Sequence, residues 1–227
     1  MSDPKQFFTV IYNEGLWHDE GRESRSGAGS TVEAAAPITR EIPELLKLLS
    51  VRSMLDIPCG DFTWMRNVEL GQTDYLGADI VEHLVEINNR EFGRPGRRFQ
   101  VLDLITDDLP KVELVLCRDC FIHLTIPMIL ASINNMVKSG STYLLTSNYP
   151  WRAYPSNDEI DDLLFGGRRI NLEIAPFEFP PPLHSIPEAE KQAIAADKSL
   201  CLWKLDTLRE PLRLAQMRYL RRSPRAV

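Results

Sequence analysis

The segment from Met54 to Trp64 has the composition of a ligand-binding turn. An apolar run ends at Asp56, the chain turns at Gly60, and a helix is predicted to follow. In an open α/β sheet, ligands bind beyond the carboxyl ends of the strands, where such turns lie. Gly60 by itself also fits any strand-to-helix turn. The dinucleotide fingerprint G-x-G-x-x-G is absent, so the loop predicts a small-molecule site of another kind.

Polar residues also follow the next predicted strands. Asp79 ends the second strand, Asp103 follows the third, and residues 118–124 follow the fourth. An ionised carboxylate can accept hydrogen bonds from two hydroxyl groups. Each acid has a structural alternative, because Asp79 can cap a helix near Val81 and Asp103 can open a turn with Thr106. The turn at Gly60, Asp79, Asp103 and residues 118–124 each come at or after the end of a successive predicted strand, and this order favours one shared site.

His123 and Asp119 are the candidates for acid–base chemistry. They are four residues apart at the start of the helix predicted after the fourth strand, so they would share one face of it. Histidine titrates near neutrality and suits the removal of a proton from a hydroxyl group. His123 can instead be a packing residue between Ile122 and Leu124. Asp119 can orient His123, contact the substrate or cap the helix.

The sequence gives little support to a metal or redox site. Asp119 and Asn148 are oxygen donors after the fourth and fifth strands, but this pair falls short of a magnesium site, and no metal is predicted. Cys117 and Cys120 form a C-x-x-C that no second pair completes. The four cysteines are therefore expected to be free thiols.

Short apolar runs that alternate with helical patterns must position these side chains. Strands are predicted at residues 53–57, 74–79, 98–102, 112–117 and 141–146. Helices are predicted from Ser30 to Leu49 with a break or kink at Pro43, over 81–90 and over 126–137. Strands separated by helices imply right-handed crossovers and a mainly parallel sheet.

The composition changes after the fifth predicted strand, where prolines become frequent. A helix is predicted near 158–164, and strands are predicted at 169–174 and 200–205, which would form a closing hairpin. The Pro-rich stretch 175–187 is expected to be an irregular loop, because each proline removes a donor and fixes φ. The basic residues 218–225 are expected to form a solvated tail.

Length and composition limit the class of protein. The 227 residues, 44% of them apolar, suffice for one domain with its own core. Residues 1–30 are polar and punctuated by glycine, which predicts an arm or lid before a single domain at 31–227. The net charge of −6 argues against binding to nucleic acid. With no apolar run of about 18 residues and no signal-peptide pattern, we expect a cytoplasmic chain without a membrane span.

Residues 54–64 resemble the acid-x-G-x-G-x-G loop of class I S-adenosylmethionine-dependent methyltransferases. Pro58 and Phe62 stand where that pattern has its first and third glycines. The resemblance covers residues 50–150. It implies an α/β fold with a Rossmann-like, doubly wound, mostly parallel seven-stranded sheet, a C-terminal antiparallel hairpin and an N-terminal lid.

The resemblance also implies a cofactor, S-adenosylmethionine, with S-adenosylhomocysteine as its product. In the family, the acid at the Asp79 position binds both ribose hydroxyls, a polar residue at the Asp103 position accepts from the adenine amino group, and the next backbone amide donates to the ring. The predicted cofactor-binding residues are Asp56, Pro58, Gly60, Asp79, Ile80, Asp103, Leu104, Arg118 and Arg25. His123 and Asp119 are the predicted catalytic residues, because the family places its acceptor after the fourth strand.

One uncharacterised bacterial branch of this family is similar to the present sequence at residues 23–30, 56–65, 118–123, 171–182, 197–198 and 202–203. Branches with a short lid often act on small molecules, including sugars and glycan ends. In the lid, Arg25 could bind the methionine carboxylate of the cofactor or an anionic acceptor as a planar fork. Three tryptophans either line the acceptor pocket or belong to the core and rim. They are Trp17, Trp64 and Trp151.

Together these observations favour methyl transfer to a hydroxyl group of a small molecule or glycan. N-methylation of a small amine stays open, because an amine needs no strong base. A nicotinamide oxidoreductase is disfavoured by the missing glycine fingerprint and by the absence of a Tyr-x-x-x-Lys motif. A domain that binds the cofactor without catalysis is a third alternative, and a homodimer is compatible with the sequence.

Overall fold

The computed structural model describes residues 2–18, 21, 23–150, 156–188 and 198–222. Its centre is a seven-stranded sheet with the order β3-β2-β1-β4-β5-β7-β6. The strands are β1 (Ser53–Asp56), β2 (Asp74–Asp79), β3 (Arg97–Val101), β4 (Leu114–Cys117), β5 (Tyr143–Asn148), β6 (His184–Pro187) and β7 (Ser199–Lys204). β1 to β5 are parallel, whereas β7 is antiparallel to both of its neighbours. The predicted Rossmann-like, mostly parallel sheet with a C-terminal antiparallel hairpin is confirmed.

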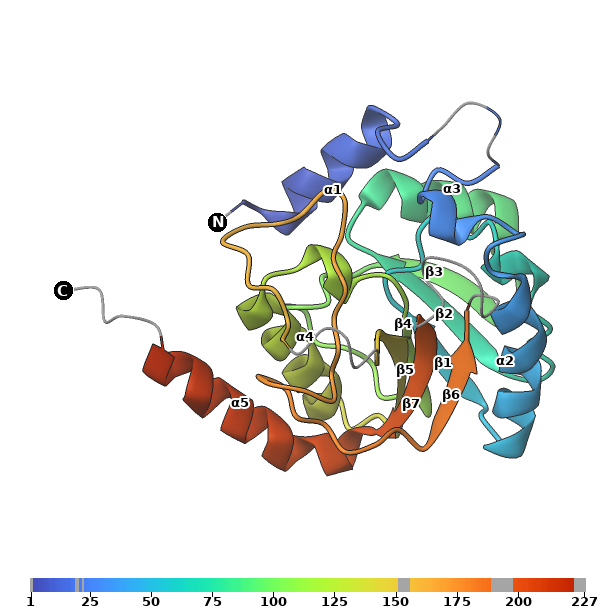
Figure 1. Cartoon of the computed structure of the whole chain (residues 1–227). Helices are drawn as coiled ribbons and strands as arrows, with labels where there is room; N and C mark the ends of the chain where they lie inside the picture. Colours follow the sequence, from blue (N-terminus) through green and yellow to red (C-terminus); the bar gives the residue numbers. More distant parts are fainter. Residues whose placement is uncertain (1, 19–20, 22, 151–155, 189–197, 223–227) are drawn as a thin grey trace.

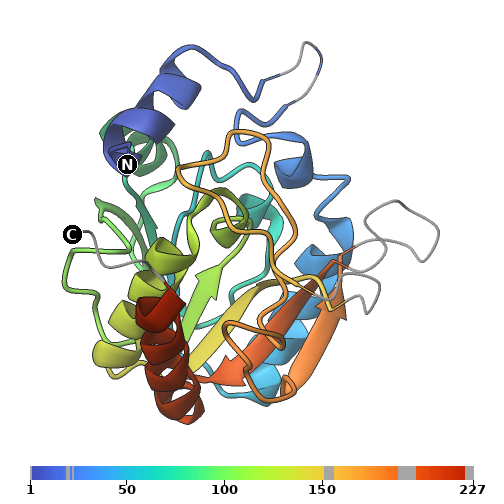
Figure 2. The ribbon, with the colours of Figure 1, turned by 60° about the vertical axis from the view of Figure 1, so that its left-hand side comes forward.

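Helices cover both faces of the sheet (Figures 1 and 2). They are α1 (Pro4–Asn13), α2 (Ala36–Leu48), α3 (Glu82–Phe92), α4 (Ile126–Lys138) and α5 (Arg209–Arg222). Short 3-10 helices are found at Ala28–Ser30, Met65–Asn67, Phe121–His123 and Leu205–Leu208. α4 and α5 pack together on one face, and α2 and α3 lie on the other. α1 belongs to neither layer and lies above the body of the domain (Figure 1).

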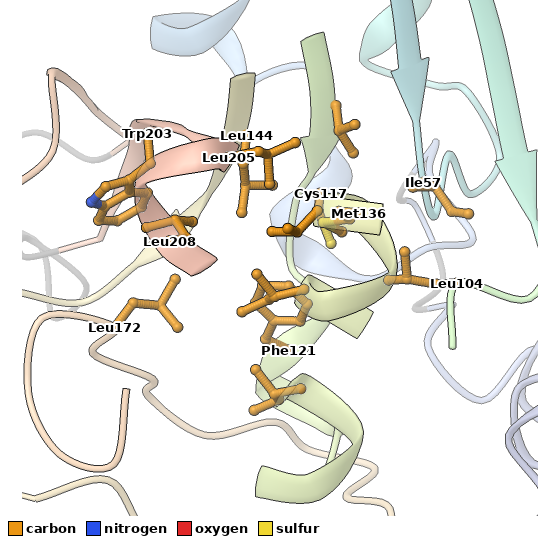
Figure 3. Close-up of a cluster of buried hydrophobic side chains, with 14 of the residues drawn as sticks. Ile57, Leu104, Cys117, Phe121, Met136, Leu144, Leu172, Trp203, Leu205 and Leu208 are labelled. Atoms are coloured by element: carbon orange, nitrogen blue, oxygen red, sulfur yellow. The ribbon is translucent and has the colours of Figure 1, made fainter. Parts of the chain in front are cut away.

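The alternation of side chains along the central strands divides the core into two clusters. Leu55 and Val115 point to the cluster that includes α4 and α5. Met54 and Leu114 point to the cluster that includes α2. Trp203 of β7 belongs to the first cluster, which Figure 3 shows. The strands are thus buried on both faces, as their continuous apolar runs predict.

The strand predicted at 169–174 is absent, and the closing hairpin has a different first strand. β7 pairs with residues 184–187, inside the Pro-rich stretch that was expected to be irregular. A strand at the edge of a sheet tolerates proline, because one of its sides has no strand to pair with. Ile170 and Leu172 are buried and produce the strand pattern. Isolated bonds hold their backbone instead of a strand ladder: Asn148 Oδ1 accepts from Leu172 N at 2.8 Å, and Ile170 O accepts from Tyr149 N at 3.0 Å.

The helix predicted at 158–164 is also absent, and this stretch is an irregular loop. It runs beside the segment after β4. Leu164 N donates to His123 O at 2.9 Å, and Arg168 N donates to Ile122 O at 3.0 Å. These bonds to a separate segment take the place of the i to i−4 bonds of a helix.

The C-terminal tail predicted at 218–225 is helical in its described part, because α5 reaches Arg222. α5 packs against α4 and buries Leu212 and Ala215. Pro211 lies in the first turn of α5, where a backbone N–H has no partner within the helix. The proline therefore does not prevent the helix.

The N-terminal helices also differ from the prediction. α2 begins at Ala36 rather than Ser30 and continues through Pro43 without a break. α1 is a helix inside the predicted arm, capped by Asp3, and it buries Ile11 and Tyr12. None of the helices in the described ranges is both long and apolar enough to span a bilayer.

Candidate active site

The ends of β1, β2 and β4 open into a cavity of about 330 Å³. Other walls come from residues 26–30, from α1 and from residues 165–166. The predicted site residues that line it are Asp56, Pro58, Gly60, Asp79, Ile80, Asp103, Leu104, Arg118, Asp119 and His123. The remaining predicted residue, Arg25, does not line it. The cavity lies where an open α/β sheet is expected to bind its ligand.

The loop after β1 depends on a glycine and on a buried aromatic ring. Gly60 has a φ of +55°, and a Cβ there would lie 2.6 Å from Ser26 Oγ, so this turn requires glycine. Phe62, at the third glycine of the family pattern, keeps a left-handed φ of +59° and packs its ring against Tyr75 and Phe99. The helix predicted after this loop is a single 3-10 turn, because the left-handed backbone at Phe62 interrupts helical geometry.

Hydrogen bonds join residues 24–26, in the segment before α2, to Asp61 in the loop after β1. Asp61 Oδ2 accepts hydrogen bonds from Arg25 N at 2.5 Å and from Ser24 Oγ at 3.0 Å. Ser26 Oγ accepts from Asp61 N at 3.0 Å and lies 2.7 Å from Tyr12 Oη. The Arg25 guanidinium donates to Tyr12 O at 2.9 Å, so its position lends no support to the predicted carboxylate contact.

Asp79 connects the loop to the end of β2. Its Oδ2 accepts from Gly60 N at 3.0 Å, and its Oδ1 accepts from Val81 N at 3.0 Å. Asp79 does not cap α3, because Val81 is the N-cap residue and α3 has no side-chain cap. Burial raises the pKa of Asp79 to about 6, although the amides of Val81 and Gly60 oppose the shift. Each carboxylate oxygen has a second lone pair, so Asp79 can also accept hydrogen bonds from a ligand in the cavity.

Two further acids line the cavity. Asp56 is buried and accepts from Tyr75 Oη at 2.5 Å. Burial raises the pKa of Asp56 to about 7, against the effect of the Tyr75 hydrogen bond. Asp103 forms the turn that was its structural alternative, accepting from Ile105 N and Thr106 Oγ1 at 2.8 Å each. Since Asp103 lines the cavity as well, the turn and the site are compatible.

His123 lines the cavity and has one ring nitrogen bonded to the protein. Its Nδ1 lies 2.7 Å from Leu164 O, and because a carbonyl oxygen only accepts, Nδ1 carries the proton. The lone pair of the neutral ring is therefore on Nε2. Burial lowers the pKa of His123, against the Leu164 hydrogen bond and the charge of Asp119. The neutral tautomer is the form that a general base requires.

Aromatic side chains surround His123. The rings of Trp17 and Phe8 lie 4.9 Å and 6.1 Å from the His123 ring, centroid to centroid. Trp17 also contacts the rings of Tyr12 and Phe165, at 5.9 Å and 6.1 Å. All of these side chains line the cavity. Trp17 was a pocket candidate from the sequence, whereas the other three were missed because the sequence analysis predicts neither α1 nor the loop beside His123.

Arg118, Asp119, Glu188 and Lys198 form a buried cluster of alternating charge beside the cavity. Glu188 Oε2 lies 2.6 Å from Arg118 Nη2 and 3.0 Å from Lys198 Nζ. Asp119 Oδ2 lies 2.6 Å from Lys198 Nζ. Arg118 Nη2 also donates to Gly29 O at 2.8 Å, which joins the N-terminal segment to β4. The sequence analysis missed Glu188, since ion pairs between distant segments have no local pattern.

The predicted pairing of Asp119 with His123 is absent. The chain after β4 forms a 3-10 turn and α4 begins only at Ile126, so the two residues share no helical face. Asp119 has a φ of +53° and is bonded to Lys198. Burial alone would raise its pKa, but the charges of Arg118 and Lys198 hold the pKa of Asp119 well below its usual range. Asp119 is therefore a weak proton acceptor.

Trp64, Asn148 and the four cysteines can be placed in the structure, whereas Trp151 cannot. Trp64 lines the cavity, and the Arg118 guanidinium lies 5.2 Å from its ring centroid, whereas Trp151 lies outside the described residues. Asn148 is bonded through both amide atoms, to Glu173 and to the backbone of Leu172. Within the described ranges, no three His, Cys, Asp or Glu residues are grouped to hold a metal ion. The four cysteines are free thiols, as predicted.

Replacement of Asp119 by asparagine should destabilise the fold. The change leaves Arg118 and Lys198 with Glu188 as the one acid of the cluster, and removing one partner from a buried ion pair costs about 3–5 kcal/mol. Thermal and urea unfolding measure the loss. Asp108→Asn, in an exposed loop position, is the matched control. Equal stability of the two variants would contradict the ionic role of Asp119, and Asp119→Asn with Lys198→Met should recover part of the loss.

No protein-family model matches the sequence, and the search of curated proteins finds no match. The fold is that of class I S-adenosylmethionine-dependent methyltransferases, as solved structures show. Magnesium protoporphyrin IX methyltransferase (ChlM) from Synechocystis PCC 6803 with bound SAM has a TM-score of 0.56 at 13% identity, over 90% of this chain and 98% of that chain.

Two further solved structures have the same fold. N-methyltransferase NodS from Bradyrhizobium japonicum WM9 has a TM-score of 0.51 at 14% identity, over 74% of this chain and 96% of that chain. PigF with SAH has a TM-score of 0.54 at 13% identity, over 76% of this chain and 56% of that chain. At these identities the likeness establishes the fold, and the reaction must be argued from the site.

Proposed function

We propose that this protein is an S-adenosylmethionine-dependent methyltransferase that methylates a hydroxyl group of a small molecule, with His123 as general base. The observation that carries the proposal is the neutral His123, with its lone pair on Nε2, in the same cavity as Asp79. A glycan acceptor and a homodimer, both compatible with the sequence, stay predictions.

The residues at the strand ends fit the cofactor. Asp79 keeps acceptor capacity toward the cavity, which suits a pair of ribose hydroxyls. Gly60 has no side chain, so a ligand can approach the backbone of this turn closely. Asp56, Pro58, Ile80, Asp103, Leu104 and Arg118 also line the cavity, whereas Arg25 of the predicted set does not. When bound, S-adenosylmethionine supplies a methyl group on a positively charged sulfur.

The residues around His123 fit the acceptor side. His123 Nε2 takes the proton of the hydroxyl group as the oxygen becomes nucleophilic. The Leu164 carbonyl, bonded to Nδ1, fixes the tautomer and stabilises the imidazolium that forms. The aromatic walls exclude water and hold the acceptor against the base. Positioning of this kind can supply a large part of the rate enhancement.

Calorimetric titration tests the cofactor first. We expect S-adenosylhomocysteine to bind and NAD to show no binding. Turnover is then followed as S-adenosylhomocysteine formed from S-adenosylmethionine with a panel of hydroxyl and amine acceptors. Binding without turnover of any acceptor would support the non-catalytic alternative, and exclusive turnover of amines would support N-methylation.

Hydrogen exchange should show that the segment before α2 tightens over the bound cofactor. The amides of Arg25 and Asp61 are bonded between this segment and the loop, so a ligand that orders both should slow their exchange. Exchange is compared with and without S-adenosylhomocysteine. Amides of the β5–β7 pair, remote from the cavity, serve as the internal control. Unchanged protection at these two amides would contradict a lid.

A further inference from the structure

The cavity has two chemically different parts. Acids and backbone amides gather at the strand ends around Asp56, Gly60 and Asp79, where the proposed function places the cofactor. The other part, called here the aromatic half, is apolar apart from one base. It is lined by Phe8, Tyr12, Trp17, Ile122, Phe165 and His123.

The side chains of the aromatic half have few hydrogen bonds to offer. Trp17 Nε1 donates to Phe165 O at 3.2 Å, and Tyr12 Oη is bonded to Ser26 Oγ at 2.7 Å. His123 Nδ1 is bonded to a backbone carbonyl. In the described structure this leaves His123 Nε2 as the unpaired polar side-chain atom of this half. A sugar would bury several hydroxyl groups here without partners, which is costly, whereas a molecule with one hydroxyl group would not.

The strength of the base favours an acidic hydroxyl group. Burial lowers the pKa of His123, and the nearest charges, Asp119 and Arg168, act in opposite directions. A phenol has a pKa of about 10, while an aliphatic hydroxyl group is closer to water, at about 15.7. Proton transfer to His123 is therefore far less uphill from a phenol than from a sugar hydroxyl group.

The arrangement of the rings in the aromatic half also favours a flat aromatic acceptor. The Trp17 and His123 rings are inclined by 33°, and the Trp17 and Phe165 rings are also inclined by 33°. Phe165 is 45% exposed at the cavity, a large apolar surface that a planar ligand would cover. Stacked and edge-on aromatic contacts add attraction beyond simple burial.

We propose that the acceptor is a phenol, a flat aromatic ring with a hydroxyl group, held by Trp17 and Phe8 with its oxygen at His123 Nε2. The inference rests on the proposed function. His123 Nε2 takes the phenol proton, the phenol oxygen bonds to the methyl carbon, and the electron pair of the breaking carbon–sulfur bond stays on sulfur. The products are an aryl methyl ether, S-adenosylhomocysteine and a proton that His123 releases to water.

Binding measurements with matched rings test the proposal. The probes are 4-methylphenol and 2-naphthol, their saturated counterparts 4-methylcyclohexanol and decahydro-2-naphthol, methyl β-glucoside and 4-methylbenzylamine. Each is titrated into the 227-residue chain saturated with S-adenosylhomocysteine. We expect the phenols to bind about tenfold more tightly than the saturated alcohols, because aromatic contacts are lost in the latter. Aryl methyl ether formed from S-adenosylmethionine is measured in parallel by mass spectrometry.

Variants show whether a loss of phenol binding comes from the missing Trp17 ring or from a disturbed fold. Trp17→Leu should lower phenol affinity about tenfold and leave S-adenosylhomocysteine affinity unchanged. Val10→Ala, at an exposed position on α1 outside the cavity lining, should bind phenols as the wild type does. Equal binding of aromatic and saturated rings, preference for the glucoside or the amine, or unchanged phenol binding in Trp17→Leu each overturns the proposal. Failure of S-adenosylhomocysteine to bind would instead overturn the proposed function.

Discussion

Replacement of His123 by alanine lowers kcat by about 10²–10⁴-fold, which is the usual contribution of a positioned general base. The affinity for S-adenosylhomocysteine barely changes, because His123 lies among the aromatic residues and not among the acids at the strand ends. Steady-state kinetics with a turned-over acceptor gives kcat, and calorimetry gives the affinity. His83→Ala, at an exposed position on α3, is the matched control and should retain wild-type kcat.

The pH dependence of the wild type follows from the same residue. Protonation of Nε2 removes the base, so kcat rises with pH as His123 loses its proton. Because burial lowers the pKa of His123 below its ordinary value, the rise should be complete at neutral pH. The His123→Ala profile should lack this step. Normal kcat in a folded His123→Ala protein would show that His123 only packs, and positioning of an already deprotonated acceptor would be the better account.

Replacement of Asp79 by alanine weakens cofactor binding by about 30- to 1,000-fold. The loss of two charge-assisted hydrogen bonds corresponds to about 2–4 kcal/mol. Titration with S-adenosylhomocysteine measures the loss, and circular dichroism shows whether the fold is intact. Asp74→Ala, at the exposed start of the same strand, should bind as the wild type does.

Asp79 also accepts from Gly60 N, so lost affinity alone does not separate a direct contact from a displaced loop. Adenosine and 2′,3′-dideoxyadenosine separate the two effects. If Asp79 binds the ribose hydroxyls, the wild type prefers adenosine and Asp79→Ala loses that preference. A preference retained in the variant would refute the ribose contact, even where overall affinity falls.

The parallel half of the fold is predictable from the sequence because each of its strands is a continuous apolar run. β2 has its predicted bounds, and the other parallel strands shift at their ends by one or two residues. Prediction fails after β5, where tertiary contacts replace local pattern. Ile170 and Leu172 are as buried as strand residues, but the side-chain amides of Asn148 and Asn157 accept from the backbone N–H groups of Leu172 and Asn171.

One part of the candidate site can be predicted from the sequence and the other part cannot. Asp56 and Asp79 end strands, and Gly60 and Asp103 lie a few residues after strands, so their meeting at one edge of the sheet can be predicted from the sequence. The acceptor side depends on α1 and on the loop near Phe165, which join β4 only in three dimensions. Short-range patterns cannot specify such contacts.

The contacts made by the first thirty residues bear on how this fold can acquire new substrates. A chain that began at residue 31 would retain the whole sheet and four of its helices. It would lose Phe8, Tyr12 and Trp17, and Asp61 and Arg118 would each lose bonds to the missing segment. On the proposed function, this N-terminal piece supplies much of the acceptor side, together with Ile122, His123 and Phe165 from the rest of the domain. Exchange of the piece between chains with the same sheet would then alter acceptor specificity, while Asp56, Gly60, Asp79 and Asp103 would be retained.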